Sequence, residues 1–147
     1  MNRRTNILMV EDNPFDVILA GEAMNDAGMP VNIENMGDGE KAMAFLKGEG
    51  AHKEAFHPDL ILLDLNLPGR DGFEVLAEIK SDPALRHIPV IVLTTSHSEE
   101  DVHRAYSLQA SCYITKPMGF NEFSKVVKSI KDFWFTVVQL PTGDCGS

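Results

Sequence analysis

The chain contains 147 residues, of which 44% are hydrophobic and 7% aromatic, enough to bury the core of one globular domain. Acidic residues outnumber basic residues by 22 to 13, for a formal net charge of −9, which argues against binding to nucleic acid or to an anionic membrane. No apolar stretch approaches the roughly 20 residues that a membrane span requires, so we expect a cytoplasmic protein with neither partner.

Five short apolar runs alternate along the chain with five segments of helical periodicity. We expect strands at residues 6–10, 31–36, 60–64, 90–94 and 112–115. The third and fourth runs read LILLD and VIVLT and are apolar on both faces, which is typical of parallel strands with helices on both sides. The alternation predicts a parallel α/β fold. We expect the flavodoxin-like, doubly wound form, with a five-stranded parallel sheet of strand order 2-1-3-4-5 and five helices.

Capping residues mark where the first three helices are expected to begin. Asn13 followed by Pro14, and later Asp38 and Asp71, are residues that favour a helix N-terminus. A fourth helix is expected at about residues 99–108 and a fifth from about residue 121. The residues expected to face inward on these two helices are Val102, Ala105 and Tyr106, then Phe123, Val126, Val127, Ile130 and Phe133.

Polar side chains lie at the C-terminal ends of four of the expected strands. Glu11 and Asp12 follow the first strand and Asp64 ends the third. Thr94 ends the fourth strand and Lys116 follows the fifth. The first and third strands are neighbours at the point where the strand order reverses, which is where ligands bind in such sheets. We therefore expect the three carboxylates to converge at this point.

Three crowded carboxylates repel one another unless a cation lies between them. Mg²⁺ prefers one or two carboxylates, several waters and a phosphate oxygen, so Asp12 and Asp64 are expected as direct ligands and Glu11 as a ligand through water. A carboxylate can also accept a phosphoryl group, whose charge Lys116 and Thr94 would stabilise. Each signal is weak alone, since an acidic pair after a strand is usually a solvated loop, but together they predict a phosphorylation switch.

Four motifs occur in an order and spacing that are highly specific: VEDN, LLDLNLPGRDG, VIVLTTS and YITKP. Through them the chain resembles the receiver domain of two-component response regulators over almost its whole length. The resemblance implies a receiver domain over residues 1–135, followed by a C-terminal tail over residues 136–147. A receiver accepts a phosphoryl group from a sensor histidine kinase.

The resemblance assigns a role to each residue of the expected site. It implies that Asp64 is the phosphoacceptor, and that Mg²⁺, or Mn²⁺ in its place, is held by Asp12, Asp64 and the backbone carbonyl of Asn66. Glu11 would complete the acidic cluster.

The same resemblance implies a conformational switch driven by phosphorylation. Thr94 looks like the hydroxyl that moves to the phosphoryl group, Tyr113 like the aromatic that rotates inward, and Lys116 like the lysine that pairs with the phosphate. The changing surface would be the face made by the fourth helix, fifth strand and fifth helix.

A narrower similarity concerns LLDLNLP, EVLAEIKSDP, IPVIVLTTS and SIKDFWF. These segments resemble the stand-alone response regulators of cyanobacterial phytochromes, which are red-light-sensing histidine kinases. The similarity implies a phytochrome-type kinase as partner and a homodimer formed through the chain after the fifth helix. Phe133, Trp134 and Phe135 offer an apolar surface for that contact, and the tail would extend it.

Three other functions are alternatives to this one. A magnesium-dependent phosphohydrolase would need a second acid where this chain has Asn66, which cannot transfer the proton. A flavin carrier would need a Gly/Ser/Thr-rich first loop, whereas EDNPF would repel phosphate. A receiver-like interaction module that is not phosphorylated remains the alternative. We expect no turnover of an external substrate, only catalysis of the protein's own phosphorylation and dephosphorylation.

Overall fold

The computed structural model describes residues 5–48, 57–116 and 119–133, with only the backbone of Phe133. Its five strands form one parallel sheet of order β2-β1-β3-β4-β5, which confirms the predicted topology. In chain order the strands are β1 (Thr5–Val10), β2 (Val31–Met36), β3 (Leu60–Leu63), β4 (Val90–Thr94) and β5 (Cys112–Thr115). The helices are α1 (Pro14–Asp26), α2 (Gly39–Leu46), α3 (Gly72–Ser81), α4 (Glu99–Ser107) and α5 (Phe120–Phe133).

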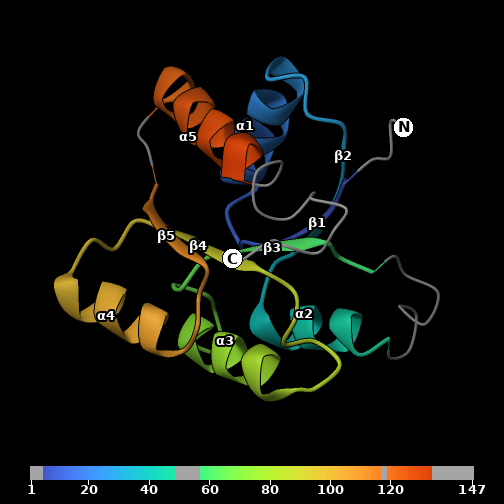
Figure 1. Cartoon of the computed structure of the whole chain (residues 1–147), viewed down its shortest axis with the longest axis vertical. Coiled ribbons are helices and arrows are strands. Elements are labelled where there is room, and N and C mark those ends of the chain that lie inside the picture. The colour runs from blue at the N-terminus through green and yellow to red at the C-terminus, as the bar shows by residue number, and fades with distance from the viewer. Residues whose placement is uncertain (1–4, 49–56, 117–118, 134–147) are drawn as a thin grey trace.

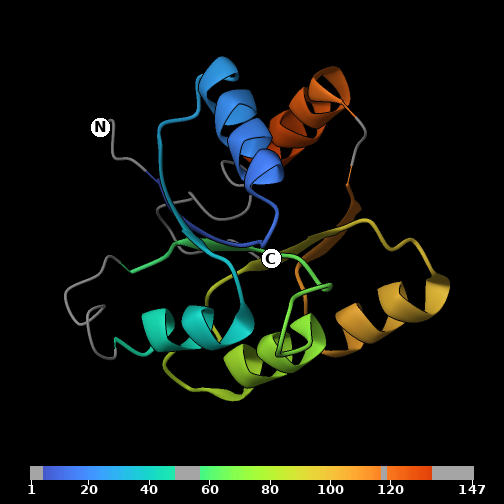
Figure 2. The same cartoon turned by 180° about the vertical axis from the view of Figure 1, so that it is seen from behind.

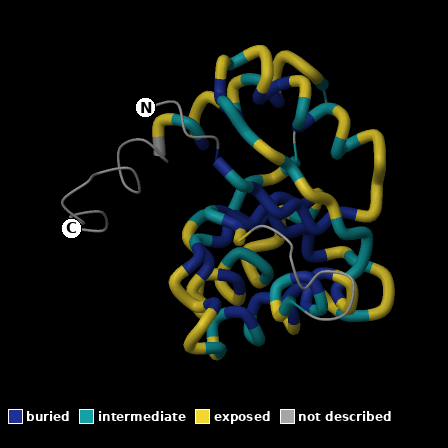
Figure 3. The backbone as a smooth tube through the Cα atoms, turned by 90° about the vertical axis from the view of Figure 1, so that its right-hand side faces the viewer, coloured by how far each residue is buried: buried dark blue, intermediate teal, exposed yellow. Residues whose placement is uncertain are grey.

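Helices cover both faces of the sheet. α1 and α5 lie side by side on one face, and α2, α3 and α4 lie on the other (Figure 1; Figure 2 gives the view from behind). Every residue of β3 and β4 is buried, as their apolar sequences predict, and buried residues concentrate in the sheet across the middle of the molecule (Figure 3). Two apolar cores therefore flank the sheet, one under each layer of helices.

Side-chain caps place the helix N-termini where the sequence predicts them. Asn13 accepts a hydrogen bond from the backbone N–H of Phe15 at the start of α1. Asp38 and Asp71 accept backbone N–H groups in the same way at α2 and α3. These caps satisfy N–H groups that have no partner within the helix, so each βα turn has a defined geometry.

The prediction that Tyr106 faces inward is wrong. Its side chain is 48% exposed, and Ala105 is the buried residue of α4. β5 is the edge strand of the sheet, so it has no further strand to pair with on its outer side. The Tyr106 hydroxyl instead accepts a hydrogen bond from the backbone N–H of Tyr113 at 3.1 Å, and its ring stays at the surface.

The strand boundaries differ from the prediction by one residue at two ends. β1 begins at Thr5, and β3 ends at Leu63 instead of Asp64. The backbone N–H of Asp64 still donates to the carbonyl of Val10 at 3.0 Å, so the chain leaves β3 held against β1. Within the described part of the chain, no helix has the length and apolar character needed to cross a membrane.

Candidate functional site

The parallel pairing of β1 and β3 brings three carboxylates together. Val10 and Leu63 are partners in the register of the two strands, so the residues that follow them lie side by side. One carboxylate oxygen from each of Glu11, Asp12 and Asp64 lies within 4.8 Å of the others. Glu11 and Asp64 are buried whereas Asp12 is exposed, which leaves the cluster open on one side. The predicted convergence of the acids is confirmed.

This donor set fits a hard divalent cation. Mg²⁺ and Mn²⁺ both favour carboxylate and carbonyl oxygens together with water. The backbone N–H of Asn66 donates to Asp64 Oδ1 at 3.1 Å, so the chain after β3 folds back over the Asp64 carboxylate. The acids of the cluster carry more negative charge than the single ammonium group of Lys116 can balance, and a cation on the open side would neutralise the remainder.

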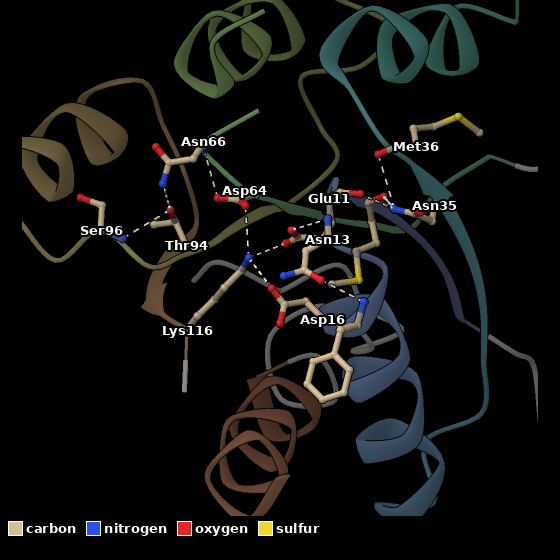
Figure 4. Close-up of polar contacts among 12 residues, drawn as sticks. Glu11, Asn13, Asp16, Asn35, Met36, Asp64, Asn66, Thr94, Ser96 and Lys116 are labelled. Carbon is tan, nitrogen blue, oxygen red and sulfur yellow. Dashed lines mark hydrogen bonds and ion pairs between the residues drawn. The ribbon is translucent and has the colours of Figure 1, made fainter. Parts of the chain in front are cut away.

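Lys116 lies in the middle of the site, where it pairs with three carboxylates (Figure 4). Its Nζ is 2.8 Å from Glu11 Oε1, 3.2 Å from Asp64 Oδ2 and 2.7 Å from Asp16 Oδ2. Burial works to lower the pKa of Lys116, but the hydrogen bonds to Asp16 and Glu11 and the charge of Asp64 outweigh it and raise that pKa. Lys116 therefore remains a cation beside the Asp64 carboxylate.

Asp16 is a site residue that sequence reasoning missed. It lies in the first turn of α1, where an acidic residue is expected on general grounds because it interacts favourably with the helix dipole. It follows Pro14, the first residue of the helix, by two positions, and nothing else in the local sequence distinguishes it. Its partner Lys116 is 100 residues away in the sequence, so local pattern does not reveal the pair.

Burial strongly raises the pKa of the Glu11 carboxyl group. Its side chain is 2% exposed, and desolvation raises its pKa from 4.5 to about 7. The hydrogen bond from Lys116 opposes the shift, while the charge of Asp64 adds to it. The backbone N–H of Asn13 also donates to Glu11 Oε2 at 3.1 Å, which fixes the carboxylate in place.

The affinity for Mg²⁺ should fall as the pH drops through about 7. With its pKa raised to about 7, Glu11 holds a proton below that pH, and the metal must displace this proton to use the charged carboxylate. One linked proton lowers the affinity by up to about tenfold per pH unit below pH 7. Calorimetric titration with Mg²⁺ between about pH 5.5 and 8 measures this dependence.

The matched variants for that titration are Glu11→Gln and Glu34→Gln. Glu11→Gln should bind Mg²⁺ more weakly at pH 8 and lose the proton linkage. Glu34 is exposed on β2, so Glu34→Gln should retain the wild-type pH profile. A wild-type affinity that stays constant from pH 8 to pH 5.5 would contradict the role of Glu11.

Thr94 is fully buried at the end of β4 and contacts Asn66 in the loop after β3. Its Oγ1 accepts hydrogen bonds from Asn66 Nδ2 at 3.3 Å and from the backbone N–H of Ser96 at 3.5 Å. The backbone N–H of Lys116 donates to the carbonyl of Thr94 at 2.7 Å, which ties the ends of β4 and β5 together. The hydroxyl and the lysine thus approach Asp64 from two adjacent strands.

Tyr113 connects this corner to the outer surface of the sheet. Its side chain is half-buried on β5, and its hydroxyl donates to the carbonyl of Ser96 at 2.8 Å. Ser96 lies two residues beyond Thr94. A displacement of Thr94 would therefore also displace the Ser96 carbonyl that accepts the hydrogen bond from Tyr113. The expected dimer residues Trp134 and Phe135, and the side chain of Phe133, lie outside the described part of the structure.

Comparisons with known proteins agree with this geometry. The family model described as the response regulator receiver domain matches residues 7–128. The chain is 47% identical over 135 residues to the response regulator Rcp1 of Synechocystis sp., covering 92% of each protein. The crystal structure of the phosphorylated cyanobacterial phytochrome response regulator RcpA is similar with a TM-score of 0.87 and 47% identity, over 95% of this chain and 99% of that one. The Mn²⁺-bound form of Rcp1 is similar with a TM-score of 0.85 and 46% identity, over 93% of this chain and 99% of that one.

Proposed function

Because this chain belongs to the response regulator receiver domain family, we propose that it accepts a phosphoryl group from a histidine kinase onto Asp64. The observation that carries this assignment is the environment of Asp64. Its carboxylate is 5% exposed, shares a cation-binding cluster with Glu11 and Asp12, and has one oxygen 3.2 Å from Lys116 Nζ. This is the arrangement that a carboxylate nucleophile needs to form an aspartyl phosphate.

The transfer forms one bond and breaks one bond. A carboxylate oxygen of Asp64 attacks phosphorus as the bond between phosphorus and the kinase histidine nitrogen breaks, and the electron pair stays on that nitrogen. The divalent cation, when bound, neutralises charge on the transferring group. Lys116 pairs with a phosphoryl oxygen, and Asp12 and the carbonyl of Asn66 would help to hold the cation.

The switch follows from the hydrogen bonds that surround Thr94. Phosphorylation adds negative charge and acceptor oxygens at Asp64, and the Thr94 hydroxyl gains a stronger partner than the amide of Asn66. As Thr94 moves, the Ser96 carbonyl that holds the hydroxyl of Tyr113 moves with it. Tyr113 rotates inward and the face made by α4, β5 and α5 changes, which shifts the equilibrium between two states.

Incubation with acetyl phosphate and Mg²⁺, followed by intact mass and peptide mapping, tests this function. We expect a mass gain of one phosphoryl group that maps to the peptide containing Asp64 and requires the metal. No labelling by acetyl phosphate or by a histidine kinase would support the alternative, a receiver-like module that is not phosphorylated. In the proposed function the protein acts on no external substrate and catalyses only its own phosphorylation and dephosphorylation.

A phytochrome-type histidine kinase is the proposed phosphoryl donor, in the cytoplasm. The similarity to Rcp1 and to the phytochrome response regulator RcpA supports this choice. Phosphotransfer time courses from a phytochrome-type kinase and from an unrelated histidine kinase would test it. The phytochrome-type kinase should transfer faster, because a cognate surface positions the phosphohistidine for attack. Equal rates would contradict the assignment of the kinase.

A homodimer formed through Phe133, Trp134 and Phe135 and the following tail is also proposed. Trp134→Ala should weaken self-association by about tenfold or more, because large aromatic side chains dominate the energetics of most interfaces. Sedimentation over a range of protein concentrations measures the change. Phe15→Ala is the matched control, since Phe15 is an aromatic residue that is 65% exposed on α1. Equal dimer fractions for Trp134→Ala and Phe15→Ala would contradict the proposed interface.

A further inference from the structure

All three N–H groups of the Lys116 ammonium have a carboxylate within reach. Nζ contacts Asp16 at 2.7 Å, Glu11 at 2.8 Å and Asp64 at 3.2 Å, and the lysine side chain is 9% exposed. An ammonium has three donors, so these contacts use its full capacity. A phosphoryl oxygen can bind Lys116 only if one of the three carboxylates gives up its hydrogen bond.

The three carboxylates differ in what the reaction demands of them. Glu11 and Asp64 belong to the cation-binding cluster, and Asp64 is also the residue that receives the phosphoryl group. Their oxygens are therefore drawn towards the metal and the phosphoryl group as the site fills. Asp16 lies outside that cluster, so its contact with Lys116 is free to persist through the reaction.

The position of Asp16 suits it for a lasting contact. It lies in the first turn of α1, where the helix dipole favours a negative charge. Its side chain is 19% exposed, so water screens the pair with Lys116 only in part. α1 also packs directly against α5, so the helix that carries Asp16 is firmly placed.

We propose that Asp16 is a positioning residue, which holds Lys116 Nζ beside the acceptor carboxylate when the metal engages Glu11 and Asp64. This inference rests on the proposed function and adds to it the residue that orients the lysine. Asp16 keeps one N–H of the ammonium, so the other two are directed at the phosphoryl oxygens. Without Asp16, Lys116 would have to be ordered during the reaction, which slows phosphorylation.

The test measures the initial rate of labelling at saturating acetyl phosphate and Mg²⁺. Asp16→Ala should lower this rate about tenfold, the usual effect of losing one charge-assisted hydrogen bond. The labelling rate of Asp16→Asn should lie between those of wild type and Asp16→Ala, because the amide oxygen still accepts an N–H from Lys116. The Mg²⁺ concentration for half-maximal rate should change by less than about twofold, since Asp16 is not in the cation cluster.

Two further variants separate positioning from a general structural role. Glu22→Gln removes one charge from an exposed site on α1 and should label at the wild-type rate. In a Lys116→Met background, Asp16→Ala should change the rate by less than about twofold, because Asp16 acts only through the lysine. Equal slowing with and without Lys116 would overturn the inference, and so would a wild-type rate for Asp16→Ala. A wild-type protein that is not labelled at all would instead overturn the proposed function on which the inference rests.

Discussion

Asp64→Asn is expected to abolish phosphorylation, with a loss in labelling rate of about a thousandfold or more. The neutral amide is a far weaker nucleophile than the carboxylate and cannot form a stable acyl phosphate. Intact mass after incubation with acetyl phosphate and Mg²⁺ measures the loss, and peptide mapping shows whether any label lies elsewhere. Labelling of another residue at the wild-type rate would contradict the assignment of Asp64 as the phosphoacceptor.

The fold should survive this substitution. The amide retains the shape of the carboxylate, and its oxygen can still accept the hydrogen bond from the N–H of Asn66. Asp64 adds to the electrostatic repulsion that raises the pKa of Glu11, so removing its charge relieves part of the strain in the cluster. We therefore expect a free energy of unfolding at least equal to that of wild type without metal, measured by urea titration.

Asp71→Asn is the matched control for the chemistry. Asp71 is exposed and caps α3 by accepting the N–H of Phe73 at 2.8 Å, seven residues after Asp64. Asn caps helices about as well as Asp, so the control has the same chemical change with little effect on stability. Asp71→Asn should be phosphorylated at the wild-type rate. Loss of labelling in both variants would point to a general disturbance of this segment.

Gly72→Ala is expected to destabilise the fold by about 3 kcal/mol or more. A Cβ at this position would lie 2.5 Å from the Cα of Leu65 and 2.6 Å from the carbonyl oxygen of Asp64, both backbone atoms. Backbone atoms cannot move aside as the end of a long side chain can, so α3 or the segment after β3 must shift. The melting temperature should fall by roughly 6–12 °C for a domain of this size.

The same substitution should also damage the site, because α3 begins directly against the backbone that carries Asp64. The N–H of Gly72 donates to the carbonyl of Leu65 at 3.1 Å, which holds the two segments in contact. Any folded Gly72→Ala protein should therefore bind Mg²⁺ more weakly than wild type. Thermal and urea unfolding with calorimetry of Mg²⁺ binding would measure both effects.

Gly21→Ala provides the contrast in α1. A Cβ there would lie 3.9 Å from Ile33 Cδ1, an ordinary contact, so the substitution meets no clash. Replacing a glycine inside a helix by alanine should raise stability by about 0.5–1 kcal/mol. If Gly72→Ala and Gly21→Ala proved equally stable, the close approach at Gly72 would be refuted.

Sequence reasoning was most successful where the signal is local. Apolar runs define the strands, and their alternation with helices predicts a parallel sheet with right-handed crossovers. The order 2-1-3-4-5 is the expectation for the five-stranded doubly wound form, and the structure confirms it. The ends of β1 and β3 carry Glu11, Asp12 and Asp64, and topology alone brings those ends together. The fold and the convergence of the acids are confirmed, whereas the roles of the individual residues stay predictions until they are tested.

The errors and omissions concern contacts between distant segments. Tyr106 was predicted to face inward because helical periodicity cannot tell a helix over the sheet centre from one at its edge. Asp71 is the predicted cap of α3, but the close approach of Gly72 to Leu65 depends on how α3 meets the end of β3 and has no signal in the local sequence. Such details depend on the angle and depth at which elements pack.

Local sequence was enough to predict the parallel α/β fold, the edge of the sheet where Glu11, Asp12 and Asp64 meet, and a set of oxygen ligands suited to a divalent cation. Those features follow from periodicity, capping and the order of elements, which are properties of short segments. The tertiary structure alone decided that Lys116 is shared among Glu11, Asp64 and Asp16, and that Glu11 is buried deeply enough to raise its pKa to about 7. Charge pairing and desolvation depend on distances and burial, and only the packing of α1 and β5 about the sheet sets those.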